Sequence, residues 1–386
     1  MTESSGASAL RVAEIQGRGR ALVASQPIKP GQIILQESPI LLYSNAVSRV
    51  SVSLNFCSHC FRRIDPPTLH SRTLSCPSCS HHAHFCSPPC RSAALTSSHS
   101  PWVCETLTRL RSSPSPDPDL QIQSNFLIAA FNLSVVSPSD FQKLISLQGE
   151  ASPNIEAATL HSLISSLSSN FASFSLELTA ALLAKDKQNA FGLMELSGDG
   201  ERSVRAYGIY PTASFFNHDC LPNACRFDYV DGHSSRNTDI IVRAIHDIAR
   251  GREVCLSYFP VNWSYKDRQK RLVEDYGFVC GCDRCQVESN WKNEEGEEEA
   301  GMEEDADEEM EEPEEEDIGQ DDTDFPHAYF FVKYLCGKEG CGGTLAPMPP
   351  SEGPVSNVME CNVCGELRKE EDMEGDDGEE EGMSIC

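Results

Sequence analysis

The chain has few of the features that would place it in a membrane, in the secretory pathway or on nucleic acid. Its longest apolar-rich stretch, Phe126 to Val136, is shorter than the roughly 20 residues of a membrane-spanning helix. Residues 1–5 lack a basic start and an apolar core, so we expect no secretory signal. No run of basic residues offers a surface to nucleic acid, so direct nucleic-acid binding is not expected.

Acidic side chains outnumber basic ones by 59 to 31, but the excess is confined to two tracts. Residues 294–324 hold 20 acidic side chains and no basic one, and residues 366–381 hold 10 acidic and two basic ones. The remainder of the chain has 29 acidic and 29 basic side chains and is close to neutral. Because the tracts contain little apolar surface to bury, we expect them to be solvated and unfolded. The alternative is that they attract a basic partner.

The 18 cysteines favour metal sites over disulfides, because we expect an intracellular chain. The first group spans residues 57–104 and supplies seven Cys and one His, the ligand count of two tetrahedral zinc ions. Its ligand candidates are Cys57, Cys60, Cys76, Cys79, Cys86, Cys90, His99 and Cys104. The histidines His81, His82 and His84 lie nearby and are alternatives to His99.

Two further cysteine groups follow. Cys280, Cys282 and Cys285 form a CxCxxC run that supplies three thiolates, so a structural zinc needs a fourth ligand, for which Cys220 is the natural candidate. The last group pairs two knuckles and predicts a zinc ribbon with the ligands Cys336, Cys341, Cys361 and Cys364. In total, 15 Cys and one His match about four zinc ions. The remaining Cys225 and Cys255 are expected as core residues, and Cys386 as a free thiol.

The hydrophobic pattern changes from strand-like to helical and back to strand-like. Helical periodicity runs from Leu120 to Ala190. Before it we expect strands at 12–15 and 33–38 with a turn at 29–32, and after it strands at 227–230, 240–245 and 253–258. A short helix is expected at 266–276, ending at Gly277. A β-rich fold is therefore split by the first cysteine group and a helical segment.

The run Asn217-His218-Asp219-Cys220-Leu221-Pro222-Asn223, with the later CxCxxC run, resembles the SET-domain protein lysine methyltransferases. The order of segments resembles the SET-and-MYND (SMYD) family and the plant ASH1-related SET proteins over residues 11–285. This resemblance implies an α+β fold: a β-rich SET domain with a pseudoknot, split by a MYND zinc finger and a helical insert, plus a C-terminal zinc ribbon. Most animal members continue into a large helical domain; here we expect the acidic linker and the ribbon to follow instead.

The resemblance and the cysteine groups together give eight segments. They are an N-terminal SET half (11–56), the MYND finger (57–104), a helical insert (105–190), a C-terminal SET half (191–261), a post-SET zinc segment (262–290), an acidic linker (291–325), a ribbon (326–368) and an acidic tail (369–386). In the finger, the family pattern pairs Cys57, Cys60, Cys86 and Cys90 at one ion, and Cys76, Cys79, His99 and Cys104 at the other.

The resemblance also implies a binding site for S-adenosylmethionine (SAM). Its expected cofactor-binding residues are Gly17, Arg18, Gly19, Asn189, Ser214, Asn217, His218, Tyr258, Tyr276 and Phe278. The expected catalytic residues are Tyr258 and Tyr276. A plain turn at Gly17–Gly19 and a helix C-cap at Asn189 remain open as alternatives. Gly277 stands where many SMYD relatives have an aromatic residue, which leaves the number of methyl groups added undetermined.

The implied function is that of a SAM-dependent protein-lysine N-methyltransferase with about four zinc ions, acting on histone tails in nuclear chromatin. A non-histone lysine substrate and a cytoplasmic location are alternatives within the same class. A different class is an adaptor whose MYND finger docks a proline-rich peptide beside an inactive SET domain. The intact GxG, NHxCxPN and CxCxxC motifs argue against inactivity.

Overall fold

A computed structural model describes residues 8–45, 56–64, 74–79, 82–113, 117–196, 202–231, 237–291, 327–350 and 355–369. The expected acidic linker and acidic tail lie outside these residues, apart from Trp291 and Lys369, and so do His81 and Cys386. Within the described part of the chain, no helix combines the length and apolarity that crossing a membrane requires.

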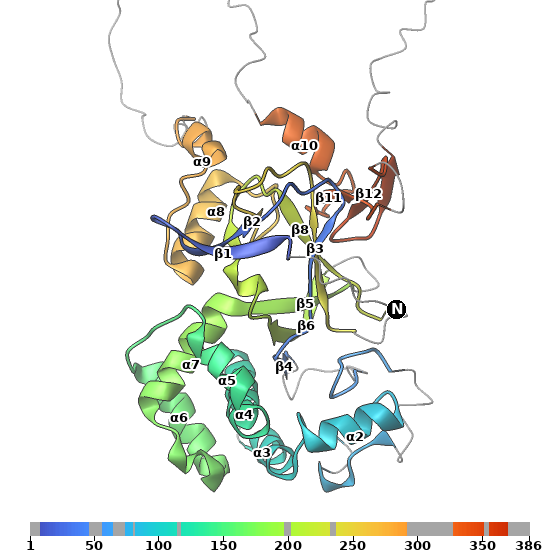
Figure 1. The fold of residues 1–386 in the computed structure, drawn as a ribbon. Helices are drawn as coiled ribbons and strands as arrows, with labels where there is room; N and C mark the ends of the chain where they lie inside the picture. The colour runs from blue at the N-terminus through green and yellow to red at the C-terminus, as the bar shows by residue number, and fades with distance from the viewer. Residues whose placement is uncertain are drawn as a thin grey trace, which may run out of the picture.

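Strands from both halves of the chain form the β-rich part of the molecule (Figure 1). The hairpin β1 (Leu10–Ile15) and β2 (Gly19–Ala24) stands beside a sheet ordered β3 (Ile33–Glu37), β9 (Ile240–Ala244) and β8 (Ala224–Asp228). A second sheet is ordered β4 (Leu41–Ser44), β6 (Arg202–Ile209) and β5 (Ala190–Leu196). Each of these two sheets thus joins one N-terminal strand to strands that follow the helical insert.

The helical insert forms a separate lobe under the sheets (Figure 1). Its elements are α3 (Pro101–Ser112), α4 (Pro118–Val136), α5 (Pro138–Ser146), α6 (Ile155–Leu167), the 3-10 turn η3 (Ser169–Ser173) and α7 (Leu176–Asn189). Capping side chains start several of them: Asn154 Oδ1 accepts the Ala157 N–H, and Ser175 Oγ accepts the Leu178 N–H. The expected helical character of residues 120–190 is confirmed.

The finger is held firmly against the SET sheets. It contains the 3-10 turn η2 (Pro77–Cys79) and helix α2 (Pro88–Thr96). Arg205 on β6 donates to the Phe61 carbonyl at 2.9 Å and forms an ion pair of 2.9 Å with Asp231. Asn237 Nδ2 donates to the Cys60 carbonyl at 2.9 Å. Helix α3 runs across the expected finger boundary at residue 104, so the finger and the insert share a helix.

The C-terminal SET half contains two segments that lie side by side. After the 3-10 turn η4 (Ala213–Phe215), strand β7 (Asn217–His218) pairs in parallel with β10 (Cys255–Leu256). Beyond them lie α8 (Tyr265–Arg271), the π-helical turn η5 (Leu272–Tyr276) and α9 (Asp283–Glu288). The expected helix at 266–276 is therefore an α-helix that widens into a π turn, and Gly277 ends it with φ +75°.

The ribbon consists of helix α10 (Ala328–Tyr334) and a three-stranded antiparallel sheet of β11 (Leu345–Pro347), β12 (Val358–Cys361) and β13 (Leu367–Lys369). Its buried side chains, among them Leu345 and Met359, share one hydrophobic cluster with Phe227 and Ile245 of the SET sheet region. Figure 1 shows the ribbon strands close to β3 and β8. The ribbon is thus packed onto the SET domain.

Candidate active site and metal centres

Four groups of Cys and His side chains are gathered in the described part of the chain, each with all four ligand atoms within 4.8 Å of one another. Close sulfur–sulfur contacts within the groups include 3.5 Å between Cys220 and Cys285 and 3.9 Å between Cys220 and Cys280. A tetrahedron of thiolates around zinc has sulfur atoms roughly 3.8 Å apart, given Zn–S bonds near 2.3 Å. The spacing and donor chemistry of all four groups therefore fit zinc.

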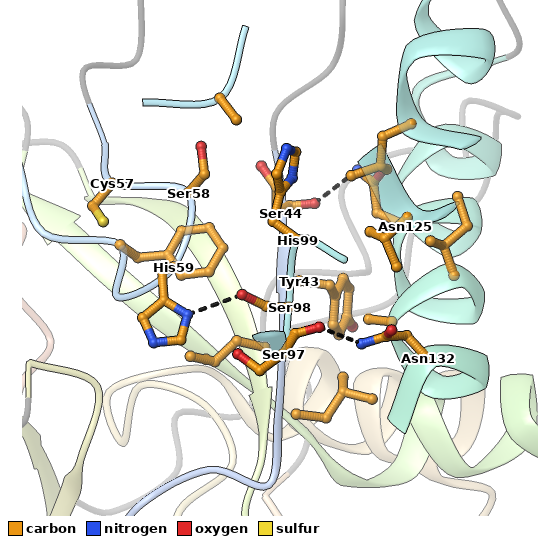
Figure 2. A pocket seen from close by; sticks show the side chains of 18 of the residues that line it. Tyr43, Ser44, Cys57, Ser58, His59, Ser97, Ser98, His99, Asn125 and Asn132 are labelled. Atoms are coloured by element: carbon orange, nitrogen blue, oxygen red, sulfur yellow. Dashed lines mark hydrogen bonds between the residues drawn. The ribbon is translucent and has the colours of Figure 1, made fainter. Parts of the chain in front are cut away.

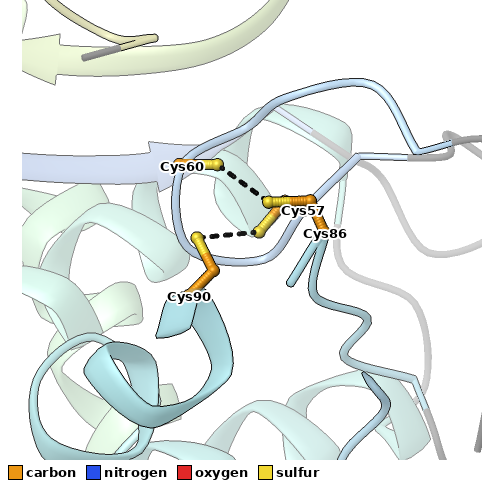
Figure 3. A group of neighbouring side chains, drawn as sticks. All are labelled: Cys57, Cys60, Cys86 and Cys90. Carbon is orange, nitrogen blue, oxygen red and sulfur yellow. Dashed lines mark hydrogen bonds between the residues drawn. The ribbon is translucent and has the colours of Figure 1, made fainter. Parts of the chain in front are cut away.

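The two finger groups interleave as the resemblance implied. Figure 3 shows Cys57 and Cys60 on one loop facing Cys86 and Cys90, of which Cys90 lies in the first turn of α2, and the second group joins Cys76, Cys79, His99 and Cys104. His99 Nε2 lies 3.9 Å from Cys79 Sγ, which identifies it as the histidine of the second group. Burial lowers the pKa of His99 to about 4, so the imidazole is neutral at pH 7, the form that zinc binds.

The third group unites Cys220 with the CxCxxC cysteines, and two buried arginines surround it. Arg268, which is fully buried, donates from Nε to Cys220 Sγ at 3.3 Å and from Nη2 to Cys285 Sγ at 3.7 Å. Arg268 also forms an ion pair of 2.6 Å with Glu288, which pairs with Arg284 as well. Four thiolates and one Zn²⁺ carry a charge of about −2, and the arginines offset part of it.

Sequence reasoning missed Arg268, Arg284 and Glu288. Arg284 lies inside the CxCxxC run, between Cys282 and Cys285. One local feature of the sequence could have revealed this ion pair. Glu288 follows Arg284 by four residues on one short helix, and this spacing predicts an ion pair between them on the face that carries Cys285.

The GxG turn contacts the Asn217–His218 strand directly. Gly17 and Gly19 have φ values of +76° and +71°, a backbone region that favours glycine. Arg18 Nη2 donates to the His218 carbonyl at 3.0 Å, and its Nε forms an ion pair of 2.8 Å with Glu253. Glu253 in turn accepts from Asn217 Nδ2 at 2.8 Å. The carboxylate of Glu253, which sequence reasoning also missed, therefore joins two of the expected cofactor motifs.

The two expected catalytic tyrosines lie together on the other side of His218. The rings of Tyr258 and Tyr276 have centroids 4.7 Å apart. Tyr258 Oη donates to the Phe216 carbonyl at 2.9 Å, and the Tyr258 N–H donates to His218 Nδ1 at 3.2 Å. Burial raises the pKa of Tyr258 and lowers that of His218 to about 3, so both groups are neutral at pH 7.

Two of the predicted cofactor residues have structural partners of their own. Both hydrogen bonds from Asn189 Nδ2 go to backbone carbonyls, those of Gln148 at 2.7 Å and Lys185 at 2.8 Å, so its side chain ties the end of α7 to a distant loop, while the C-cap of the helix is Ala190. Ser214 Oγ donates to the Tyr210 carbonyl at 3.0 Å. Phe278, which follows Gly277 in the post-SET segment, is 39% exposed. Gly277 caps the π turn, which gives it a backbone role besides any effect on a channel.

A cavity of about 420 Å³ lies between the finger, strand β4 and helices α3 and α4. Figure 2 shows three hydrogen bonds along its wall: His59 Nδ1 with Ser98 Oγ at 2.9 Å, Asn125 Nδ2 to the Ser44 carbonyl and Asn132 Nδ2 to the Ser97 carbonyl. Apolar side chains such as Val103, Leu107 and Ile128 complete the lining. Sequence reasoning predicted no cavity here.

Comparisons with known proteins agree with the motif assignment. A family model described as SET domain matches residues 19–259. The chain is 54% identical to histone-lysine N-methyltransferase ASHR2 of Arabidopsis thaliana, over 94% of this chain and 96% of that protein. It is 25% identical to ASHR1 of the same plant, over 94% of this chain and 65% of the relative. The human histone-lysine N-methyltransferase SMYD3 is 25% identical, over 70% of this chain and 60% of its own length.

Solved structures give a weaker match. The crystal structure of the SET domain of LSMT bound to lysine and AdoHcy aligns with a TM-score of 0.34 and 14% identity, over 73% of this chain and 55% of that chain. A similarity this low supports no further conclusion. The family match itself begins at Gly19, inside the GxG turn, and ends at Phe259, directly after Tyr258.

Proposed function

The chain belongs to the SET-domain family, related to the plant ASH1-related SET proteins, and we propose that it is a SAM-dependent protein-lysine N-methyltransferase acting on a histone tail. The observation that carries the proposal is the continuous network of Arg18, Glu253, Asn217 and His218 beside the tyrosine pair. The similarity to ASHR2, which carries the name of a histone-lysine methyltransferase, supports the substrate class. Nuclear chromatin is the corresponding location.

When bound, SAM supplies a methyl group on a positively charged sulfur, so the protein has to orient the reactants and exclude water. Gly17, Arg18, Gly19, Asn217 and His218 would hold the cofactor; Tyr258, Tyr276 and Phe278 would bound the lysine site. A free lysine is neutral only about once in 2,500 molecules at pH 7. Packed aromatic rings such as those of Tyr258 and Tyr276 favour the neutral, nucleophilic amine by desolvation.

Zinc has a structural part in this proposal. Each of the four Cys and His groups would hold one ion, and the third group would fix the Asn217–Cys220 strand to the post-SET segment. No step of the methyl transfer needs a metal ion.

The direct test is transfer of a labelled methyl group from SAM to a mixture of core histones, followed by mapping of the modified residue. We expect label on lysine with the wild-type chain and none without SAM. Methylation of other nuclear or cytoplasmic proteins, with core histones left unlabelled, would keep the lysine methyltransferase assignment and replace the substrate. SAM binding without any transfer would favour the adaptor class.

The cavity beside the finger favours a second function that is compatible with the first. A proline-rich peptide, the ligand expected for the MYND finger, would find there the side chains of Phe56 and His59 next to strand β4. Fluorescence anisotropy with a labelled proline-rich peptide tests this idea. His59→Ala should weaken binding, whereas Leu95→Ala, on the finger helix α2 and outside the cavity lining, should not. Equal affinities of both variants and the wild type would place the peptide elsewhere.

A further inference from the structure

The C-terminal ribbon contacts the SET domain through charged groups that are buried on both sides. Arg243 on β9 forms an ion pair of 2.7 Å with Glu360 on β12, and the two side chains are only 1% and 11% exposed. Tyr229 Oη donates to the same carboxylate at 2.7 Å, and the Arg243 guanidinium lies 3.5 Å from the centroid of the Phe227 ring. Breaking such a buried pair is costly, so this interface fixes the ribbon in one position.

One knuckle of the ribbon touches the segment that follows the expected catalytic Tyr258. A Cβ atom added to Gly342, next to the metal-group residue Cys341, would lie 2.7 Å from Asn262 Oδ1 and 3.1 Å from Pro260 Cβ. The backbone of the knuckle therefore packs directly against residues 259–263, which we call the brace loop.

A second ribbon element reaches the brace loop through the post-SET zinc group. The ring of Phe331 on α10 lies 4.6 Å from the guanidinium carbon of Arg284. Arg284 Nη1 donates to the Val261 carbonyl of the brace loop at 2.6 Å, and its Nη2 donates to the Trp263 carbonyl at 3.3 Å. A cation–π contact of this kind restricts the guanidinium and so stabilises both hydrogen bonds.

The brace loop in turn contacts the site. The Phe259 ring lies 4.6 Å from the His218 ring and stacks on Trp263 at 5.3 Å, with the two planes within 1°. Tyr258, which precedes the loop, donates its N–H to His218. A shift of the brace loop would therefore move both Tyr258 and His218.

We propose that the C-terminal zinc ribbon is a positioning element of the active site, which holds the brace loop from two sides through the Gly342 knuckle and through Phe331 on Arg284. The inference rests on the proposed methyltransferase function for its kinetic consequences. Its structural consequence, an ordered brace loop, does not depend on activity.

Substitutions at Phe331 distinguish a role of the ribbon in positioning the brace loop from a role in folding alone. Phe331→Leu keeps an apolar side chain but removes the aromatic face, and Phe331→Tyr restores that face. We expect Phe331→Leu to lower kcat roughly fivefold, with KM for the peptide little changed, and to speed amide exchange in residues 258–263. Phe331→Tyr should recover the wild-type kcat and the wild-type exchange rate. Val332→Ala, at an exposed position on the same helix, is the control and should match the wild type. Wild-type kcat and exchange in Phe331→Leu would overturn the proposal.

The ribbon metal gives an independent test. Cys364→Ser should lose one zinc ion of four by metal analysis, with the other groups retained, and should also speed exchange in residues 258–263. Loss of that ion with unchanged exchange and unchanged SAM affinity by calorimetry would contradict a positioning role. If the wild type transfers no methyl group, the proposed function fails, but the exchange and SAM-affinity comparisons still decide the role of the ribbon.

Discussion

The Arg18 guanidinium donates a hydrogen bond of 3.0 Å to the backbone carbonyl of His218, although 200 residues separate the two in the chain. The same guanidinium forms an ion pair with Glu253 on the segment leading to β10. Three distant motifs, the GxG turn, the Asn217–His218 strand and the segment that ends in Tyr258, therefore meet at one side chain. This contact favours the proposed role of the GxG turn in the cofactor site over that of a plain turn.

Arg18→Lys should weaken SAM binding roughly tenfold, because an ammonium group cannot donate along the fork directions that reach both Glu253 and the His218 carbonyl. Isothermal calorimetry with SAM measures the effect. Arg11→Lys, an exposed position on the neighbouring strand β1, is the matched control and should bind SAM as the wild type does. Equal affinities in the two variants would remove Arg18 from the cofactor site.

Tyr258→Phe should lower kcat roughly 100-fold, while the thermal midpoint falls only slightly, because the ring packing remains and the hydroxyl is lost together with its hydrogen bond to the Phe216 carbonyl. The assay is methyl transfer to a histone substrate at saturating SAM. Tyr329→Phe, whose side chain is 67% exposed on α10, controls for the loss of a hydroxyl elsewhere. Unchanged turnover in Tyr258→Phe would exclude a catalytic role for that hydroxyl.

Cys220→Ser should lose both one zinc ion and SAM affinity, since the strand Asn217–His218 leads directly into this ligand. Metal analysis should find about four ions in the wild type and about three in the variant. Cys225→Ala, a buried cysteine outside all four groups, should keep about four. Two ions or fewer in the wild type, or normal SAM affinity in Cys220→Ser, would disprove the coupling.

The stability of the helical lobe should depend on pH through Asp186 on α7. Burial raises the pKa of this carboxyl from 3.8 to about 7, even though Tyr43 Oη donates to it at 2.6 Å. The folded chain thus retains a proton that the unfolded chain has lost between pH 4 and 7. The stability contributed by the protonated group is complete below pH 4 and disappears as the pH rises through 7.

Asp186→Asn should therefore flatten the fall in the free energy of unfolding between pH 5 and pH 7, as measured by chemical denaturation. The amide still accepts from Tyr43 and carries no charge at either pH. Asp247→Asn, at an exposed carboxylate, should leave the wild-type difference intact. If Asp186→Asn showed the full wild-type difference in the free energy of unfolding between the two pH values, Asp186 would not be the source of that difference.

Sequence spacing located the metal groups well, because zinc ligands come in short pairs whose separation along the chain reflects the geometry of a knuckle. The pairing of Cys57 and Cys60 with Cys86 and Cys90 came from family resemblance, and the structure brings these four residues together. Periodicity found the helical segment at 120–190 for the same local reason. The ends of strands were predicted less accurately. Of the expected strand 253–258, only Cys255–Leu256 forms a strand with ladder pairing.

Contacts between distant residues left no local pattern to detect. Glu253, Arg268 and Arg284 occupy ordinary charged positions in the sequence, and only the fold buries them against the GxG turn and the third metal group. The role of Asn189 was undecided for the same reason, since its partners include the carbonyl of Gln148, 41 residues earlier in the chain.

The sequence by itself determined the short Cys pairs that supply the metal groups, the SET-type motifs and the alternation of strands and helices, because each depends on spacing within a few residues. The tertiary structure decided which charged groups meet. It joined Arg18 to Glu253 and His218, and it placed the ribbon against the loop that follows Tyr258. Those contacts arise when distant segments bury their apolar faces together, and such long-range packing has no signature in a short window of sequence.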